Sequence, residues 1–339
     1  MTIYDISEKA GVSIATVSRV LNGSSRVSEK TRQKVLRVMQ ECDYIPNAFA
    51  RGLGLNTMKT IGILCADSSD LYLAKAIYYI ERKLRASGYD SILCCSGYDL
   101  ETKQSAMNLL LTKKVDGIIL VGSNYVYEEA SDNKYIADAA LQIPIMLLNA
   151  ALNVPNVYSV LLDDYRSMYN AACQLLESGI EDPLYFYCSD SYSGKKKLAG
   201  FLQAMEDHHC PILPEHIQFF SGDHEDIPAM TAQLLSLREK GLSFRGVIAA
   251  DDTLALSAVK YAKLAGLCIP KDLSVIGYNN SMLATCCDPE LTSIDNKLET
   301  LCQQLITTLM GVLGGDEMPK KTVFSGELVK RGTTLSYSK

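Results

Sequence analysis

Two adjacent carboxylates, Asp251 and Asp252, are the clearest candidates for acid–base chemistry in this 339-residue sequence. Adjacent helical residues diverge by roughly 100° around the axis, so the pair is poorly placed to act on one substrate atom. The sequence also lacks a G-x-S-x-G, a G-x-G-x-x-G after a strand, a Walker A and an H-E-x-x-H motif. We therefore predict that the protein is not an enzyme and uses no cofactor.

Histidine and cysteine residues gather loosely between positions 208 and 224, as His208, His209, Cys210, His216 and His224. Their spacing matches no zinc template, and none of the 11 cysteines forms a C-x-x-C motif. Most cysteines, such as Cys65 and Cys188, lie in apolar segments and are predicted to be reduced core residues. The sequence thus predicts no metal site.

Polar side chains follow many of the apolar runs that we predict to be strands. Ligands in open parallel sheets bind beyond the carboxyl ends of the strands, where hydroxyl, amide and carboxylate groups would suit a sugar, a nucleoside or another polar metabolite. The structural alternative is that Asp67, Ser69 and Asp252 cap helices. The strand-end candidates are Asp67, Ser69, Asp70, Tyr72, Ser123, Asn149, Ser189, Asp190, Tyr192, Asp251, Asp252 and Asn279.

Alternating strands and helices must position these residues. Buried β-type runs between amphipathic helices indicate parallel sheets covered on both faces, and two such sets in tandem predict two lobes with a ligand site between them. Predicted strands are 60–66, 90–95, 117–121, 145–149, 184–188, 217–220, 246–249 and 273–278. Predicted helices are 71–87, 101–113, 164–178, 195–207, 227–240 and 253–264.

The first 60 residues follow a different, all-helical pattern. Thr2 and Asp5 form a capping box, Gly11 ends the first helix, and Ser13 and Ser28 cap the next two. Val17, Val20 and Leu21, then Val35, Leu36 and Met39, are predicted as buried stripes. Two short helices joined by a tight turn and followed by a third predict a helix-turn-helix.

The outer face of the second helix carries residues that can contact DNA. Arg19 can donate to guanine, Thr16 and Ser18 can contact phosphates or base edges, and Ile14 and Ala15 can touch thymine methyl groups. The alternative is a small three-helix bundle with a solvated polar face. An apolar Ile14 on that face argues against this alternative.

The charge distribution agrees with a DNA-binding N-terminus. The net charge is −6, but residues 1–60 carry nine Lys or Arg against five Asp or Glu, a balance of +4 that leaves −10 for the rest. The longest apolar runs are too short to span a bilayer, and acidic residues interrupt the N-terminus where a signal peptide would need an apolar stretch. A periplasmic transport protein would need such a peptide, so we expect a cytoplasmic, nucleoid-associated protein.

Long motifs in this N-terminal segment resemble the LacI/GalR family of repressors. The residues that carry the resemblance are 3–13, 15–22, 27–32 and 44–47. The resemblance extends to 48–53, which looks like the hinge helix of the family. By position, Leu53 is the leucine that would wedge into the minor groove and kink the duplex. The expected DNA contacts are Thr2, Tyr4, Ser13, Ile14, Ala15, Thr16, Ser18, Arg19, Asn22, Arg26, Asn47, Ala50, Arg51 and Leu53.

Motifs typical of the same family also occur after residue 60, at 248–252, 274–280, 289–294 and 328–334. The implied fold is an N-terminal all-α helix-turn-helix domain (lambda-repressor-like) followed by a two-lobed α/β domain of the periplasmic-binding-protein-like type I class, with three crossings between the lobes. The predicted domains are a head (1–45), a hinge (46–59) and an effector-binding and dimerisation domain (60–339). Lobe 1 is predicted at about 60–160 and 291–323, and lobe 2 at about 161–290 and 324–339.

The sequence departs from the family pattern at four positions of the expected effector site. Lys197 stands where sugar-binding relatives have an arginine, Asn279 replaces an aspartate, and Asp251 replaces an asparagine. His224 stands where relatives often place an aromatic ring. A lysine lacks the bidentate fork of arginine, so the effector is not expected to be a typical neutral hexose. The alternatives are that no effector is used or that a protein corepressor replaces it.

These observations predict a transcription regulator, most simply a repressor, whose operator affinity is controlled by a small polar metabolite. The expected partners are double-stranded, pseudo-palindromic operator DNA, a second copy of the chain and the effector, with no membrane contact. The effector-site candidates are the strand-end residues other than Asp190 and Asp252, together with Lys197 and His224, which the resemblance adds.

Overall fold

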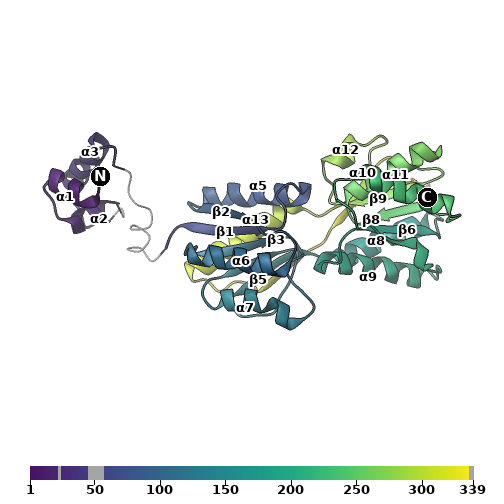
Figure 1. The fold of residues 1–339 in the computed structure, drawn as a ribbon, viewed down its shortest axis with the longest axis horizontal. Coiled ribbons are helices and arrows are strands. Elements are labelled where there is room, and N and C mark those ends of the chain that lie inside the picture. Colours follow the sequence, from purple (N-terminus) through teal and green to yellow (C-terminus); the bar gives the residue numbers. More distant parts are fainter. Residues whose placement is uncertain (22–23, 45–56, 336–339) are drawn as a thin grey trace.

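The computed structural model describes residues 1–21, 24–44 and 57–335. It contains a three-helix N-terminal bundle and two α/β lobes, which Figure 1 shows side by side. No helix among the described residues is both long and apolar enough to cross a bilayer.

The N-terminal head consists of α1 (Ile3–Ala10), α2 (Ile14–Leu21) and α3 (Glu29–Glu41). Its core contains Ile6, Ala10, Val17, Val20, Val35 and Met39. Leu36, which we predicted in the buried stripe of the third helix, is 43% exposed. It lies one residue beyond Val35, about 100° further around the helix, and so faces away from the core.

Lobe 1 is built on a six-stranded sheet in the order β11-β5-β4-β3-β1-β2, in which every pairing is parallel. Its strands are β1 (Thr60–Cys65), β2 (Asp90–Cys95), β3 (Gly117–Val121), β4 (Ile145–Leu148), β5 (Val157–Leu162) and β11 (Lys321–Phe324). Its helices are α5 (Leu71–Ala86), α6 (Leu100–Thr112), η1 (Ala130–Asn133), α7 (Lys134–Ala140) and α13 (Leu298–Gly314).

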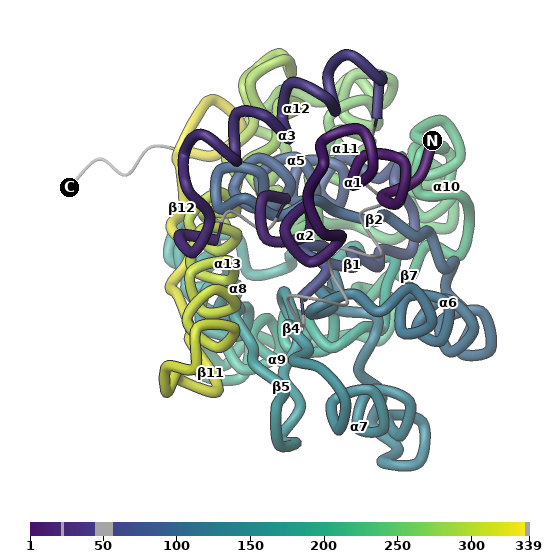
Figure 2. The backbone as a smooth tube through the Cα atoms, turned by 90° about the vertical axis from the view of Figure 1, so that its left-hand side faces the viewer, coloured from purple at the N-terminus to yellow at the C-terminus, as the bar shows by residue number. Residues whose placement is uncertain are grey.

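Both faces of the sheet are buried along its central strands β1, β3, β4 and β5, which explains why these strands are continuous apolar runs. Alternate strand residues point to opposite faces: Ile119 and Val121 pack under α5 and α13, whereas Ile118 and Leu120 pack against α6 and α7. Figure 2 shows these two pairs of helices on opposite sides of the sheet.

Lobe 2 repeats this design with the strand order β12-β10-β9-β8-β6-β7. Its strands are β6 (Pro183–Tyr187), β7 (Ile217–Phe219), β8 (Gly246–Ala249), β9 (Ser274–Tyr278), β10 (Thr292–Asp295) and the antiparallel β12 (Glu327–Val329). Its helices are α8 (Asp164–Glu177), α9 (Tyr192–Asp207), η2 (Pro214–His216), α10 (Ile227–Glu239), α11 (Asp252–Ala265) and α12 (Met282–Cys286).

The chain passes between the lobes three times, as predicted: after β5, after β10 and after β11. The predicted lobe boundary at residue 291 is wrong, because β10 lies in the second sheet. Thr292, Ser293 and Ile294 pair with Ile276, Gly277 and Tyr278 of β9, so the second crossing comes only after Asp295. The crossing segments place the carboxyl ends of the strands of both sheets toward the region between the lobes (Figure 1).

Candidate functional site

The turn between α1 and α2 is fixed by local hydrogen bonds. Gly11 adopts a left-handed conformation with φ 58°, and its backbone N–H donates to the carbonyls of Glu8 and Ser7. Ser7 Oγ donates to the carbonyl of Val12 at 2.9 Å. The Ser13 hydroxyl accepts from the backbone N–H of Thr16 at 3.2 Å, which confirms that Ser13 caps α2.

This turn leaves the predicted DNA-contact face of α2 open to solvent. Ile14 is 40% exposed, Ala15 and Arg19 are exposed, and Thr16 and Ser18 are half-buried. Tyr4, on the neighbouring α1, is 66% exposed. The head therefore exposes an arginine together with Ile14 and the ring of Tyr4, side chains that suit base edges with thymine methyl groups better than water.

The other predicted DNA contacts divide into two groups. Thr2 is exposed and its hydroxyl belongs to the capping box of α1, and Arg26 is exposed in the segment before α3. Arg32 holds this segment in place by donating to the carbonyl of Ser24 at 2.7 Å. Five predicted contacts lie outside the described residues, namely Asn22, Asn47, Ala50, Arg51 and Leu53.

In lobe 1, the strand ends place Asp70, Tyr72 and Asn149 at the region between the lobes. Asp70 caps α5 by accepting from Leu73 N at 2.8 Å, and Asn149 Nδ2 donates to the Tyr72 hydroxyl at 2.5 Å. Burial raises the pKa of Tyr72 well above its ordinary value, so this hydroxyl stays neutral. The amide oxygen of Asn149 is buried and has no hydrogen-bond partner among the described residues.

In lobe 2, Asp251 follows β8 and His224 lies in the loop between β7 and α10. His224 Nε2 lies 2.9 Å from Asp251 Oδ2 and Nδ1 lies 4.0 Å from Asp70 Oδ2, so the ring stands between carboxylates of the two lobes. The hydrogen bonds to Asp251 and Cys188 raise the pKa of His224 to about 11. Burial acts to raise the pKa of Asp251, but hydrogen bonding to His224 and the charge of its ring outweigh burial and lower it.

Cys188 completes this group, although we predicted it as a core residue. It follows β6 directly, is only half-buried, and its thiol lies 3.7 Å from Asp251 Oδ2. Its position at a strand end was the available signal, and an apolar interpretation of cysteine hid it. We call the set Asp70, Tyr72, Asn149, Cys188, His224 and Asp251 the interlobe site.

Lys197 and Asn279 lie nearby but are engaged by protein groups. Lys197 Nζ donates to the carbonyl of Ala250 at 2.9 Å and lies 3.7 Å from the centre of the Tyr278 ring. Asn279 Oδ1 accepts from Asn296 Nδ2 at 3.0 Å. A ligand at this position would therefore contact a lysine whose ammonium group already donates to a carbonyl and lies over an aromatic ring.

A second group of residues joins the lobes directly. Ser123 of lobe 1 donates through Oγ to Ser191 Oγ at 2.9 Å, and its carbonyl accepts from Tyr192 N at 3.1 Å. Glu128 and Lys195 form an ion pair at 2.7 Å beside them. Ser123 and Tyr192 were predicted for effector binding, whereas Ser191 was not; in this conformation all three bridge the lobes.

Apart from Asp190, the remaining strand-end residues make local structural hydrogen bonds. Asp67 accepts from the backbone and hydroxyl of Ser69, both at 2.8 Å, in a tight turn rather than a helix cap. Asp252 is 2% exposed and accepts from Ser281 N and Ser293 Oγ, both at 2.6 Å, while Asp251 caps α11. Ser189 is exposed and its hydroxyl accepts from Ser191 N at 3.3 Å. Asp190 is exposed as well.

Comparison with known proteins adds two family matches. Residues 2–47 match the model described as bacterial regulatory proteins, lacI family, and residues 172–334 match that of a periplasmic binding protein-like domain. An HTH-type transcriptional regulator of Lachnoclostridium phytofermentans is 53% identical over 335 residues, covering 98% of this chain and 99% of that protein. The HTH-type transcriptional regulator AscG of Escherichia coli is 30% identical and covers 100% and 99% of the two chains.

Among solved structures, a lac repressor dimer bound to operator and the anti-inducer ONPF is similar to this chain over 99% of both chains, with a TM-score of 0.87 and 26% identity. A complex of the transcriptional regulator CelR with cellobiose has a TM-score of 0.71 at 22% identity, covers 98% of this chain and 99% of that one, and shares the fold.

Proposed function

The chain belongs to the lacI family of bacterial regulatory proteins, and we propose that it represses transcription by binding a pseudo-palindromic operator as a homodimer. As a member of that family it is a DNA-binding transcription regulator. The exposed face of α2 is the observation that carries the operator proposal, because it presents Arg19 and the apolar Ile14 to solvent, with the exposed Tyr4 on the adjoining α1. Such a regulator acts in the cytoplasm, on the nucleoid.

Operator binding is tested by selecting bound sequences from a random DNA library with the purified full-length protein at stated salt. We expect enrichment of a sequence with two-fold symmetry, because a symmetric dimer presents two equivalent heads. Enrichment of a single half-site without symmetry would contradict the dimer, and no enrichment with or without added metabolites would contradict operator binding.

We further propose that a small polar molecule binds between the lobes and controls operator affinity. Lobe 1 offers the amide of Asn149 and lobe 2 offers His224 and Asp251. The unpartnered amide oxygen of Asn149 supports this proposal, since a buried acceptor without a donor costs roughly 1–3 kcal/mol and a ligand donor would recover that energy.

Ligand binding is tested by thermal unfolding of the full-length protein against a panel of sugars, nucleosides and organic acids. A true ligand should raise the melting temperature in proportion to the logarithm of its concentration. The same ligand should shift an Asn149→Ala variant less than the wild type. An equal shift in both proteins would place the ligand elsewhere.

A further inference from the structure

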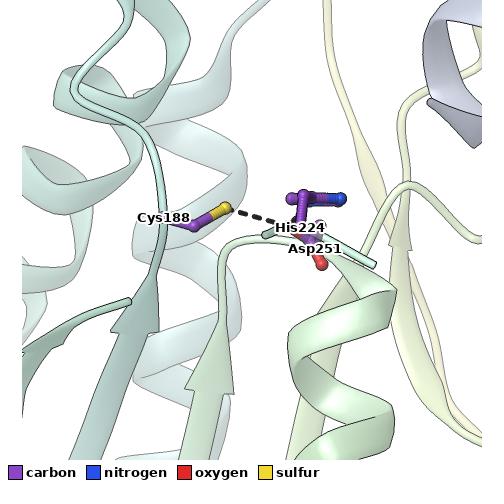
Figure 3. A group of neighbouring side chains, drawn as sticks. All are labelled: Cys188, His224 and Asp251. Carbon is purple, nitrogen blue, oxygen red and sulfur yellow. Dashed lines mark hydrogen bonds and ion pairs between the residues drawn. The ribbon is translucent and has the colours of Figure 1, made fainter. Parts of the chain in front are cut away.

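Three metal-ligating side chains meet at the carboxyl edge of the second sheet, although they are far apart in the sequence. Cys188 and Asp251 follow β6 and β8, which are parallel neighbours in the sheet, and His224 comes from the loop after β7. One ligand atom from each lies within 4.8 Å of both others. Figure 3 shows these side chains converging from separate segments.

The distances between the donor atoms are close to those of a tetrahedral metal centre. His224 Nε2 and Asp251 Oδ2 are 2.9 Å apart, and Cys188 Sγ and Asp251 Oδ2 are 3.7 Å apart. Zinc bonds of about 2.0–2.3 Å at tetrahedral angles separate such donors by roughly 3.3–3.6 Å. The donors of His224 and Cys188 lie within 4.8 Å of each other, so modest side-chain adjustments would let all three donors reach one ion, which would displace the ring proton of His224 and the thiol proton of Cys188.

The carboxylate of Asp251 is held so that a single oxygen faces the other donors. Its Oδ1 accepts from the backbone N–H of Leu254 at 2.9 Å and caps α11. Oδ2 takes no part in the capping bond and faces His224 and Cys188, so it could act as a monodentate ligand while the capping bond fixes the side chain. Its side chain is 14% exposed and that of His224 is 39% exposed, so an ion could reach them.

Asp70 supplies a further carboxylate from the other lobe. Its Oδ2 lies 4.0 Å from His224 Nδ1, the ring nitrogen that does not face Asp251. Histidines that ligate metals usually donate their second ring N–H to a carboxylate or carbonyl, which orients the ring. Asp70 is itself fixed by capping α5, so a small movement of the lobes toward each other would complete this hydrogen bond.

From this arrangement we propose that Cys188, His224 and Asp251 bind a divalent transition-metal ion such as Zn²⁺, with Asp70 orienting His224 from the opposite lobe. A thiolate, an imidazole and a carboxylate together favour zinc or cobalt over magnesium or calcium, which prefer oxygen ligands. The proposal rests on the proposed function in one respect, because it places the ion where a controlling ligand is expected to bind.

Cobalt(II) is a suitable probe because it enters zinc sites and absorbs visibly when tetrahedral, with a charge-transfer band when a thiolate is bound. The full-length protein, reduced and treated with chelator, is titrated with Co²⁺ and then displaced with Zn²⁺. We expect one thiolate-bound ion per chain. Cys188→Ser should abolish the charge-transfer band, and His224→Gln should weaken binding by more than about 100-fold, beyond the effect of an outer-shell change.

Matched variants separate this site from adventitious binding by other thiols. Cys95→Ser, at an exposed cysteine at the end of β2, should leave affinity and spectrum unchanged. Asp70→Asn should keep the thiolate band but weaken binding by about 10- to 100-fold. The proposal is overturned if Co²⁺ binds Cys188→Ser with the wild-type band, or if the folded wild type shows no thiolate-bound cobalt.

Selection of operator DNA with both the metal-free and the cobalt-loaded protein keeps the two proposals apart. A thiolate–cobalt band without operator binding by either form would overturn only the operator proposal. Operator binding by a protein that gives no such band would overturn only the metal site.

Discussion

Several charged side chains of this chain are held in place by neutral protein groups, and Lys103 is the most buried of them. It is 1% exposed, and its ammonium donates to the carbonyl of Asn124 at 2.6 Å and to the Tyr127 hydroxyl at 2.8 Å. The Tyr125 ring lies 5.3 Å from the same nitrogen. Burial lowers the pKa of Lys103 to about 8, and the more distant Asp99 only partly opposes this.

We predict that Lys103 makes stability depend on pH in the alkaline range. Its pKa is about 8 in the folded chain against an ordinary value of 10.5, so the unfolded chain holds more protons between these values. The stabilising contribution is therefore complete above about pH 10.5 and is lost as pH falls through about 8. Relative to Lys103→Met, the wild type should gain up to about 3 kcal/mol over that interval.

Urea unfolding of both proteins at a series of pH values from 7 to 10 measures this difference. Groups common to both chains cancel in the comparison, and burial raises the pKa of Tyr127, which keeps that hydroxyl neutral over much of the range. Parallel stability profiles for the two proteins would show that Lys103 does not titrate in this way.

Arg19 gives a second prediction for a single side chain. If it donates to a guanine, Arg19→Ala should remove about 1–3 kcal/mol of discrimination at one base position of each half-site. Arg37→Ala, at an exposed arginine of α3, should lower affinity slightly without changing sequence preference. Quantitative selection on a random library measures both, and unchanged preference in Arg19→Ala would exclude this base contact.

Many helices and strands followed from the hydrophobic pattern of the sequence, but β5, whose six residues are all buried, and α7 were not predicted. The strands at 90–95, 117–121 and 246–249 were predicted at their observed bounds. The last two are buried throughout and form continuous apolar runs between turns, as central parallel strands do. The elements after residue 278 were not predicted as such, and α13 lies in this part. Its apolar residues surround the helix more widely than a single stripe, because it packs on both α5 and the sheet.

The interlobe site was predictable only in part, for a related reason. Asp70, Asn149 and Asp251 follow from the rule that ligands bind beyond parallel strand ends, and the family resemblance pointed to His224. Cys188 was missed although it follows β6 directly, because a cysteine beside an apolar run was interpreted as a core residue. Nothing in the sequence shows, in addition, that the segment after β7, which carries His224, returns to the ends of β6 and β8. That return is set by the packing of the lobe and has no local pattern.

Close packing of α8 on α9 gives a prediction for a pair of helices. A Cβ added at Gly200 would lie 2.2 Å from the carbonyl oxygen of Tyr165, so the two helices would have to separate. We expect Gly200→Ala to destabilise lobe 2 by about 1–3 kcal/mol. Gly314→Ala, near the end of α13, meets only Asp316 Oδ2 at 3.9 Å and should be neutral or slightly stabilising.

Urea unfolding of both glycine variants, followed by circular dichroism, measures this contrast. Since α8 and α9 carry no predicted DNA contact, selection of operator DNA below the unfolding transition should be unaffected. Equal stability of Gly200→Ala and the wild type would mean that the helices accommodate the methyl group without separating.

The largest movement that the fold suggests is a change in the position of one lobe relative to the other. Three chain segments cross between them, and the polar contacts that bridge them include Ser123 with Ser191 and Glu128 with Lys195. Few apolar contacts would be lost if these polar groups separated, so opening costs little compared with unfolding either core. A ligand that binds both lobes can therefore shift the equilibrium between open and closed forms.

If lobe movement controls operator affinity, then fixing the lobes together should fix that affinity. The Ser123 and Ser191 hydroxyl oxygens are 2.9 Å apart, so Ser123→Cys with Ser191→Cys places two thiols within reach of a crosslink. We expect the oxidised double variant to differ from its reduced form by about tenfold in operator affinity, within the usual range of coupling energies. A ligand that shifts the reduced protein should no longer shift the oxidised one, because the equilibrium on which it acts has been removed. Fluorescence anisotropy with the selected operator measures both effects, and the single variant Ser123→Cys controls for oxidation of other cysteines. Equal affinities and equal ligand responses before and after crosslinking would show that the operator signal does not pass through the relative position of the lobes.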